Sequence, residues 1–306
     1  MNKTSRRVRF LSCLIILVPA VPTSVRAQCA FGNNQSLPPT DCNGPAALRA
    51  DNPYPRYFAI NAALGAVTAG VSSHLHGGPF WRALPPGAFG GALVFVGKLT
   101  TSRQSQAAGF VGREIGAAGS SIVQNVSLNK PMLERFVFPL GPTRLYIRAK
   151  DSTSARLKID FAGTLATIYA ATRPHSRMDF SASLRAGAPV FMMPRPTSGA
   201  VWEGMHLAGT IQVRFDPGAL ASYPSLVKQR TADAISHELV HVAQYDFSFI
   251  AWTEAGESAL LRRIPGARKV SGFVDLSLNA PIWLALDGLL PHDNRPWERE
   301  AMAFTR

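Results

Sequence analysis

The feature that most constrains the fold of this chain is a long segment without any charged side chain, residues 57–81. Alanine and glycine are frequent in it, and its bulkier apolar residues recur at steps of three and four, the period of one stripe on an α-helix. That stripe consists of Ile60, Leu64, Val67, Val71 and Leu75. The pattern predicts a long helix that packs by this stripe in a helical layer. A helix of this composition could also lie against a membrane surface.

A second segment, which begins at Val111, repeats this period. Its apolar stripe consists of Val111, Ile115, Ala118, Ile122 and Val126. Four glycines run beside it and predict a face where another backbone approaches closely; they are Gly109, Gly112, Gly116 and Gly119. Between the two segments, Pro85-Pro86-Gly87 predicts a break in the chain's regular structure. We therefore expect a Gly/Ala-rich helical region over residues 57–130.

Beyond residue 130 the period changes to two, which is typical of strands. Apolar and polar side chains alternate within residues 144–148, 156–161 and 211–215. One apolar and one polar face per strand predicts an antiparallel sheet that is covered on its apolar side. The last third returns to helical patterns, over residues 226–247 and 249–263, and Pro296 begins a final helix. The sequence thus predicts an α+β fold.

The N-terminus has the composition of an export signal. Basic residues precede an apolar run from Phe10 to Val21, which is too short to span a bilayer. We expect residues 1–27 to be a signal peptide, and the protein to be exported to a periplasmic or extracellular compartment. An extended lead, residues 28–56, follows. In oxidising surroundings its Cys29 and Cys42 are expected to form a disulfide that stabilises the fold by about 3 kcal/mol.

The distribution of charge argues against nucleic acid as a partner. The 306 residues carry a net charge of +13, from 32 Lys and Arg against 19 Asp and Glu. Without residues 1–27, which hold five basic and no acidic side chains, 27 basic against 19 acidic residues leave +8. The remaining basic residues are scattered singly, without the aromatic-interleaved basic run typical of a nucleic-acid interface. We predict no nucleic-acid partner.

The stretch AISHELVHVAQYD, residues 234–246, contains the residues that indicate a function most clearly. His237 and His241 are four residues apart, so on a helix both imidazoles point to the same side, with Glu238 beside them. Two imidazoles suit zinc, which in a catalytic site takes three protein ligands and keeps one position for water. The metal lowers the pKa of this water, and a neighbouring carboxylate can accept its proton.

This stretch resembles the zincins, zinc peptidases whose active-site helix carries His-Glu-x-x-His between uncharged flanks. The resemblance covers about residues 205–306. It implies a Zn²⁺ cofactor held by His237 and His241, with Glu238 as general base and a peptide or protein as substrate. Nothing after His241 supplies the Gly and third His of the metzincin branch. The resemblance therefore points to the gluzincin branch, in which a Glu from a later helix completes the site.

Three glutamates are candidates for this third ligand. The tail WEREAMAF resembles the Glu-x-x-Ala-Asp segment of CAAX-protease-type gluzincins and related uncharacterised exported bacterial families, which implies Glu298. Met302 stands where that segment has its aspartate, so the usual support for a ligand is missing. Glu254 lies on the next helix, only 13 residues after His241, and Glu300 is the choice in a shifted register.

The resemblance also implies how a substrate is held. Zincins hold extended substrate against an edge strand that precedes the active-site helix, and residues 209–215 are expected to form that strand. A donor to the tetrahedral oxyanion is needed as well. The candidates are His206, Tyr223, Tyr245, His292 and Arg299.

Taken together, the resemblance implies a zincin-like lobe of sheet and active-site helices over residues 131–306, and an exported zinc metallopeptidase. Two other functions stay open. One is an envelope protein whose zincin-like lobe has no catalytic role. The other is a membrane-associated assembly protein that uses the glycine-rich helices.

Overall fold

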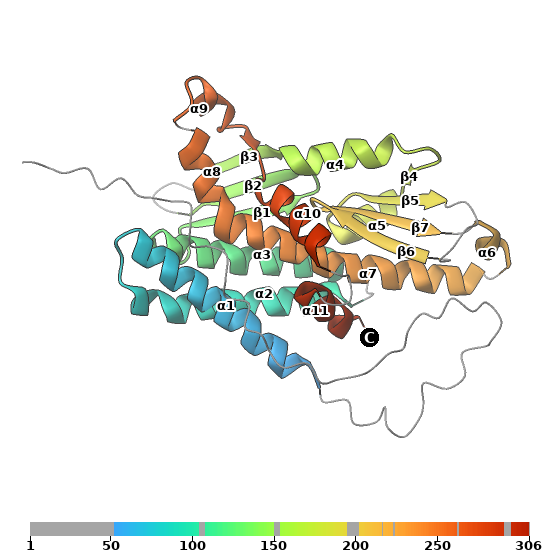
Figure 1. Ribbon diagram of the computed structural model, residues 1–306, viewed down its shortest axis with the longest axis horizontal. Helices are drawn as coiled ribbons and strands as arrows, with labels where there is room; N and C mark the ends of the chain where they lie inside the picture. Colours follow the sequence, from blue (N-terminus) through green and yellow to red (C-terminus); the bar gives the residue numbers. More distant parts are fainter. Residues whose placement is uncertain are drawn as a thin grey trace, which may run out of the picture. The chain divides into compact units, whose positions relative to one another are not determined.

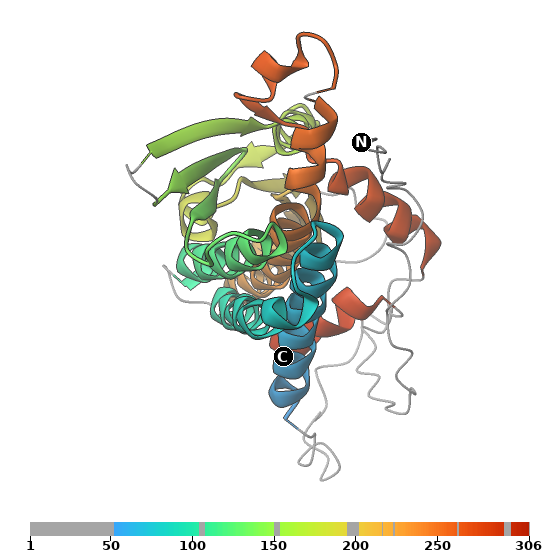
Figure 2. The same ribbon diagram turned by 90° about the vertical axis from the view of Figure 1, so that its left-hand side faces the viewer.

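The computed structural model describes residues 52–103, 108–149, 154–194, 202–215, 217–222, 224–261, 263–290 and 295–305. The expected signal peptide and the Cys29–Cys42 disulfide lie outside these residues. Three long helices come first: α1 (Tyr54–Leu75), α2 (Phe80–Thr101) and α3 (Ala108–Ser127). They lie side by side (Figures 1 and 2). The helical region predicted for residues 57–130 is therefore confirmed.

Glycines let these three helices pack backbone against backbone. A Cβ atom on Gly97 of α2 would lie 2.6 Å from the carbonyl oxygen of Gly112 and 2.6 Å from the amide nitrogen of Gly116, both on α3. Gly65 of α1 faces the backbone of α2 at Gly91 in the same way. The close approach predicted for the glycine row of α3 is confirmed.

The predicted break at Pro85-Pro86-Gly87 is wrong, because α2 continues through both prolines. A proline inside a helix removes the hydrogen bond to the carbonyl four residues earlier. Here those carbonyls belong to Trp81 and Arg82, which lie in the exposed first turn of α2. Water can bond to carbonyls at this position, so the lost bonds cost little.

The apolar stripe of α1 also differs from its predicted place. Bulky side chains such as Leu64, Val67 and Val71 are exposed. The buried side of α1 instead carries small or polar residues: Asn61, Gly65, Ala69, Gly70 and Ser73. Because α1 and α2 are so close, only residues without bulk fit between them.

Within the described residues two sheets of four strands follow, and both are mixed. The first has the order β1 (Arg135–Leu140), β2 (Thr143–Arg148), β3 (Ser154–Asp160) and β8 (Val274–Asp275), with β3 and β8 parallel. The second has the order β4 (Arg177–Met178), β5 (Val190–Pro194), β7 (Thr210–Phe215) and β6 (Trp202–Leu207), with β5 and β7 parallel. The α+β class is confirmed. The single antiparallel sheet is wrong, because long connections return β7 and β8 in the direction of their partners.

The covered face of the first sheet carries buried charged side chains, which the alternation of apolar and polar residues did not predict. Arg144 Nη2 lies 2.6 Å from Asp160 Oδ2, and Lys158 Nζ lies 2.9 Å from Asp275 Oδ1, all in buried side chains. The apolar Leu157 on the other face is exposed. Opposite charges that pair and hydrogen-bond can offset the cost of their burial, and a hydropathy pattern does not detect this pairing.

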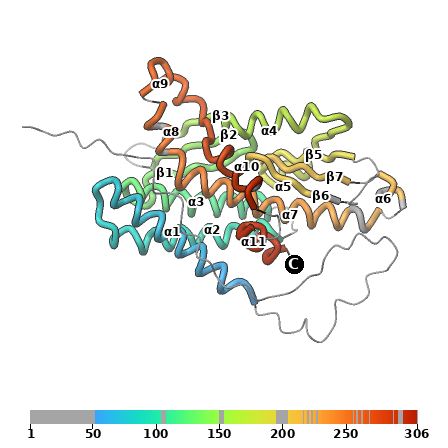
Figure 3. The backbone as a smooth tube through the Cα atoms, in the orientation of Figure 1, coloured from blue at the N-terminus to red at the C-terminus, as the bar shows by residue number. Residues whose placement is uncertain are grey.

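Helices between and after the strands complete the fold. They are α4 (Phe161–Ala171), α5 (Phe180–Ala186), α6 (Pro217–Ser222), α7 (Pro224–Ser248), the π-helical turn η2 (Phe249–Thr253), α8 (Glu254–Leu261), α9 (Ala267–Val270), α10 (Asn279–Leu289) and α11 (Pro296–Phe304). The three helices predicted in the last third are confirmed in α7, α8 and α11. Leu239 and Val242 fix α7 on the second sheet by packing against Ile211 and Val213 of β7. The last helix, α11, returns to lie against α7 (Figure 3).

Candidate metal centre

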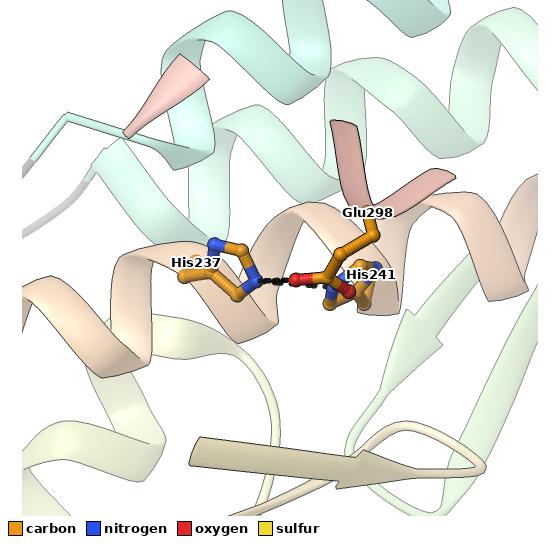
Figure 4. Close-up of side chains that lie close together, drawn as sticks. All are labelled: His237, His241 and Glu298. Carbon is orange, nitrogen blue, oxygen red and sulfur yellow. Dashed lines mark hydrogen bonds and ion pairs between the residues drawn. The ribbon is translucent and has the colours of Figure 1, made fainter. Parts of the chain in front are cut away.

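Helix α7 and helix α11 bring three side chains with metal-binding atoms to one point. His237 and His241 project from the same side of α7, and Glu298 reaches them from the first turn of α11 (Figure 4). Glu298 Oε1 lies 2.8 Å from His237 Nε2, and Glu298 Oε2 lies 3.0 Å from His241 Nε2. The two Nε2 atoms are 3.2 Å apart. The carboxylate thus faces both imidazoles at once.

These three side chains fit a zinc ion. Donors held about 2.1 Å from a tetrahedral zinc lie about 3.4 Å from one another. The nitrogen-to-nitrogen distance of 3.2 Å agrees with this spacing, and one ligand atom from each of the three residues lies within 4.8 Å of the others. Two imidazoles and one carboxylate are also a donor set that suits this metal. His237, His241 and Glu298 could therefore hold zinc with small adjustments of their side chains.

The ring of His241 is oriented by a glutamine one turn further along α7. Its Nδ1 lies 2.8 Å from Gln244 Oε1. Gln244 Nε2 donates to Glu300 Oε2 at 2.7 Å and to the Trp297 carbonyl at 3.1 Å, so the amide oxygen is the atom that faces His241. The oxygen accepts a hydrogen bond from Nδ1–H, so Nε2 is the ring nitrogen that faces Glu298 and is available to a metal.

Glu300 is itself held by two residues of the helical layer. Lys98 Nζ on α2 donates to Glu300 Oε2 at 2.8 Å, and Asn61 Nδ2 on α1 donates to Glu300 Oε1 at 2.6 Å. Lys98 also donates to Asn61 Oδ1 at 2.8 Å, and all three side chains are buried. A continuous buried network thus runs from α1 and α2 through Gln244 to the candidate metal ligand His241. This network holds the ring of His241 through hydrogen bonds, which the apolar side chain of Met302 cannot make to a ligand.

The short distances between Glu298 and the two histidines shift the pKa values of Glu298 and His241. Burial opposes ionisation of Glu298, but its hydrogen bonds with His237 and His241 outweigh this and lower the pKa of the carboxyl well below its usual range. Burial likewise disfavours the charged form of His241, but the hydrogen bond with Glu298 prevails and raises the pKa of this imidazole to about 9. Glu298 is therefore an anion at neutral pH, as a metal ligand must be.

The edge strand of the second sheet approaches the motif from the other side. Gly204 of β6 lies against Glu238, and a Cβ atom at position 204 would be 2.5 Å from Glu238 Oε1. The ring of His206 stacks on His241 with centroids 5.3 Å apart, and its Nδ1 lies 3.9 Å from Glu238 Oε2. Burial, followed by the charge of His241, lowers the pKa of His206 to about 3. His206 is therefore neutral at physiological pH.

The other acidic candidates lie elsewhere. Glu254 pairs with Arg135 of β1, with Oε2 2.6 Å from Nη2. Glu300 faces Gln244 and Lys98, as described above. The structure therefore brings Glu298 to the two histidines and does not bring Glu254 or Glu300 there.

Among the candidate oxyanion donors, His206 is the one placed beside the motif within the described residues. Tyr245 is buried in a cluster with Ala166 and Ala280, and Arg299 is exposed. Tyr223 and His292 lie outside the described residues. The expected edge strand is also corrected: residues 210–215 form β7, which lies between β5 and β6, and the edge strand is β6. Strand β6 comes before β7 in the chain and forms a hairpin with it, so β6 occupies the edge beside β7.

Sequence reasoning missed the residues that support His241. Gln244 could have been found, because it lies three residues after His241 and so on the same side of the helix. Lys98 and Asn61 lie 202 and 239 residues from Glu300 along the chain. No local pattern connects residues so far apart.

We predict that Gln244→Leu weakens zinc binding about 10-fold to 100-fold, because His241 loses the partner that fixes its ring. Competition with a chromophoric chelator measures the affinity. Gln212→Leu is the matched control, since Gln212 is fully buried but its amide atoms have no hydrogen-bond partner among the described residues. An equal effect of both variants would show that the loss comes from a disturbed core and not from the ligand's support.

Comparison with known proteins gives no independent guide to the family. No match was found among protein-family models, curated proteins or solved structures.

Proposed function

We propose that this protein is a zinc-dependent peptidase of the gluzincin type, with a zincin-like lobe formed by the second sheet, α7 and α11. The observation that carries the proposal is the position of Glu298. It comes from the far end of the chain, yet its carboxylate lies within 3.0 Å of both histidines of the motif. A chance His-Glu-x-x-His in a buried helix would not need a third donor, or a supporting network behind His241.

In this proposal His237, His241 and Glu298 hold the metal and Glu238 moves the proton. Zinc, when bound, supplies a Lewis acid that polarises a carbonyl group and lowers the pKa of water. Glu238 accepts a proton from the water that attacks the carbonyl carbon, and then donates it to the amide nitrogen, which leaves as an amine when the C–N bond breaks. Gly204 leaves room for this carboxylate beside β6. In this proposal His206 donates a hydrogen bond to the substrate's carbonyl oxygen.

Strand β6 supports a peptide as substrate. Among the described strands it pairs on one side only, with β7. An extended peptide can add to such an edge through main-chain hydrogen bonds. Since Gly204 and His206 of β6 face the motif, a peptide bound along this strand would pass the proposed metal ligands. We also propose that the peptidase works after export, which the composition of residues 1–27 supports.

Digestion of a peptide library tests the proposal. We expect the zinc-loaded protein to cleave peptides, and a zinc chelator such as 1,10-phenanthroline to stop cleavage. Added Zn²⁺ should restore it, because the donors are protein side chains that stay in place. A cleavage rate that is the same with and without chelator would contradict the proposal.

One observation favours a second function, a zinc site without catalysis. Glu238 is only 6% exposed, and His241 only 5%, so the motif is more enclosed than a site that must admit a protein substrate. In that case the protein would bind zinc with the same three ligands and cleave none of the library.

A further inference from the structure

The outward face of α1 is apolar between Arg56 and His74. The side chains of Phe58, Leu64, Val67, Val71 and Leu75 are 38% to 55% exposed. No charged residue occurs between Arg56 and Arg82. A helix on the surface of a water-soluble domain normally turns a polar face outward. In α1 the polar Asn61 and Ser73 are buried and the bulky apolar residues are outside.

Helix α2 also has apolar side chains on its exposed side. It pairs with α1 as an antiparallel hairpin, since Gly91 of α2 packs on Asn61 and Leu84 of α2 packs on Gly70. Its exposed side chains include Phe89 and Val96. Between Arg82 and Lys98 it has no charged residue, and Lys98 is buried in its ion pair with Glu300.

Basic residues mark both ends of the hairpin. Arg56 lies at the first turn of α1, next to the end of α2, where Arg103 is exposed. At the other end lie Arg82, which is exposed, and Trp81, which is 76% exposed. An apolar band that ends in basic residues on both sides, with an exposed tryptophan at one of them, is typical of a segment in a lipid bilayer. The basic side chains complement the phosphates of lipid headgroups.

The length of the band matches a bilayer. From Arg56 to Leu75 an α-helix rises about 28 Å, close to the hydrocarbon thickness of about 30 Å. Among the described helices, α1 is long and apolar enough to cross a membrane, and only 28% of its apolar window is buried. A core helix of a soluble protein would be mostly buried. Packing through Gly65 and Gly91 is also how helices associate where lipid provides no hydrophobic force between them.

We propose that the α1–α2 hairpin inserts into the hydrocarbon of a lipid bilayer, with the outward side chains of α1 in contact with acyl chains. The Asn61–Lys98–Glu300 network lies toward the Arg56 end of the hairpin, so the candidate metal centre would lie near the bilayer surface at that end. The geometry then assigns peptide segments close to a membrane as the substrate class, and this assignment rests on the proposed function.

Labelling from inside the bilayer tests the insertion. The full chain is reconstituted into vesicles of phosphatidylcholine and phosphatidylglycerol that contain a phosphatidylcholine with a photoactivatable carbene group in its acyl chain. After illumination, mass spectrometry compares the peptides of α1 with that of α5, whose Leu184 is 80% exposed but lies outside the hairpin. We expect label on Val67 and Val71 at least tenfold above that on Leu184. Equal label on α1 and α5 would overturn the proposal.

Variants refine the test. The pair Val67→Glu and Val71→Glu should lower the label on α1 at least tenfold, and the conservative pair Val67→Leu and Val71→Leu should keep it. If the Glu pair does not fold, as judged by circular dichroism, the unmodified protein still decides the outcome. A detergent-free protein that forms dimers through α1 and takes up no label would overturn the proposal and assign this face to a second copy. Because labelling needs no catalysis, the failure of the peptidase proposal would not affect this result.

Discussion

Replacing Glu238 by glutamine is expected to stop peptide hydrolysis while zinc stays bound. Glu238 is not one of the three converging donors, so the metal content should remain about one ion per chain. A glutamine cannot accept the proton of the attacking water, and the loss of a general base typically lowers a rate by about 100-fold to 10,000-fold. Steady-state cleavage of the best library peptide, with metal analysis of the same samples, measures both quantities.

The control for this variant is Glu134→Gln, which changes a carboxylate that pairs with Lys130 at 3.2 Å, away from the site. It should keep full activity. If Glu238→Gln cleaves peptides at the rate of the unmodified protein, Glu238 is not the base. If neither protein cleaves peptides but both hold zinc, the enclosed site has no catalytic role.

Replacing Glu298 by alanine is expected to empty the site. The two histidines alone give zinc only two protein ligands, fewer than the three or four of stable sites. The metal content should fall from about one ion per chain to below about one-tenth after dialysis. The folded structure should persist, because α11 still packs through Ala301 and Phe304. Metal analysis and circular dichroism check the two expectations.

The variant Glu254→Gln tests whether another buried carboxylate, and not Glu298, is the third metal ligand. It should retain zinc but reduce stability by about 3 kcal/mol, because it leaves Arg135 without its buried partner. Glu300→Gln should retain zinc with weaker affinity, since Glu300 acts through Gln244. Zinc retained in Glu298→Ala but lost in Glu254→Gln would reverse the assignment of the ligand.

The sequence predicts the local part of this site better than its surroundings. The place of His237 and His241 on one side of a helix follows from helical geometry, and the structure has it. Glu298 follows only from a resemblance of the tail, and the structure brings it to the histidines. The network behind His241 depends on three distant segments that meet in space, and no residue pattern within any one of them reveals it.

The fold shows the same division. Helical and strand periods predict most elements, because they report which residues share a side. They do not report which side is covered. In α1 the apolar side is outside because glycine packing occupies the other side. In the first sheet Arg144 and Lys158 are buried because Asp160 and Asp275 face them. Both errors came from the assumption that the apolar side is always inside.

The zinc-edge X-ray absorption spectrum of the purified protein tests the central claim most directly, because it reports the ligands of the metal without requiring catalysis. We predict one zinc per chain, with two imidazole nitrogens and at least one carboxylate oxygen at about 2.0–2.2 Å. His241→Ala and Glu298→Ala should each retain less than about one-tenth of this zinc, so the spectrum of the bound metal should be lost in both variants. A protein that holds no stoichiometric zinc, or a spectrum that these two variants leave unchanged, would contradict the account.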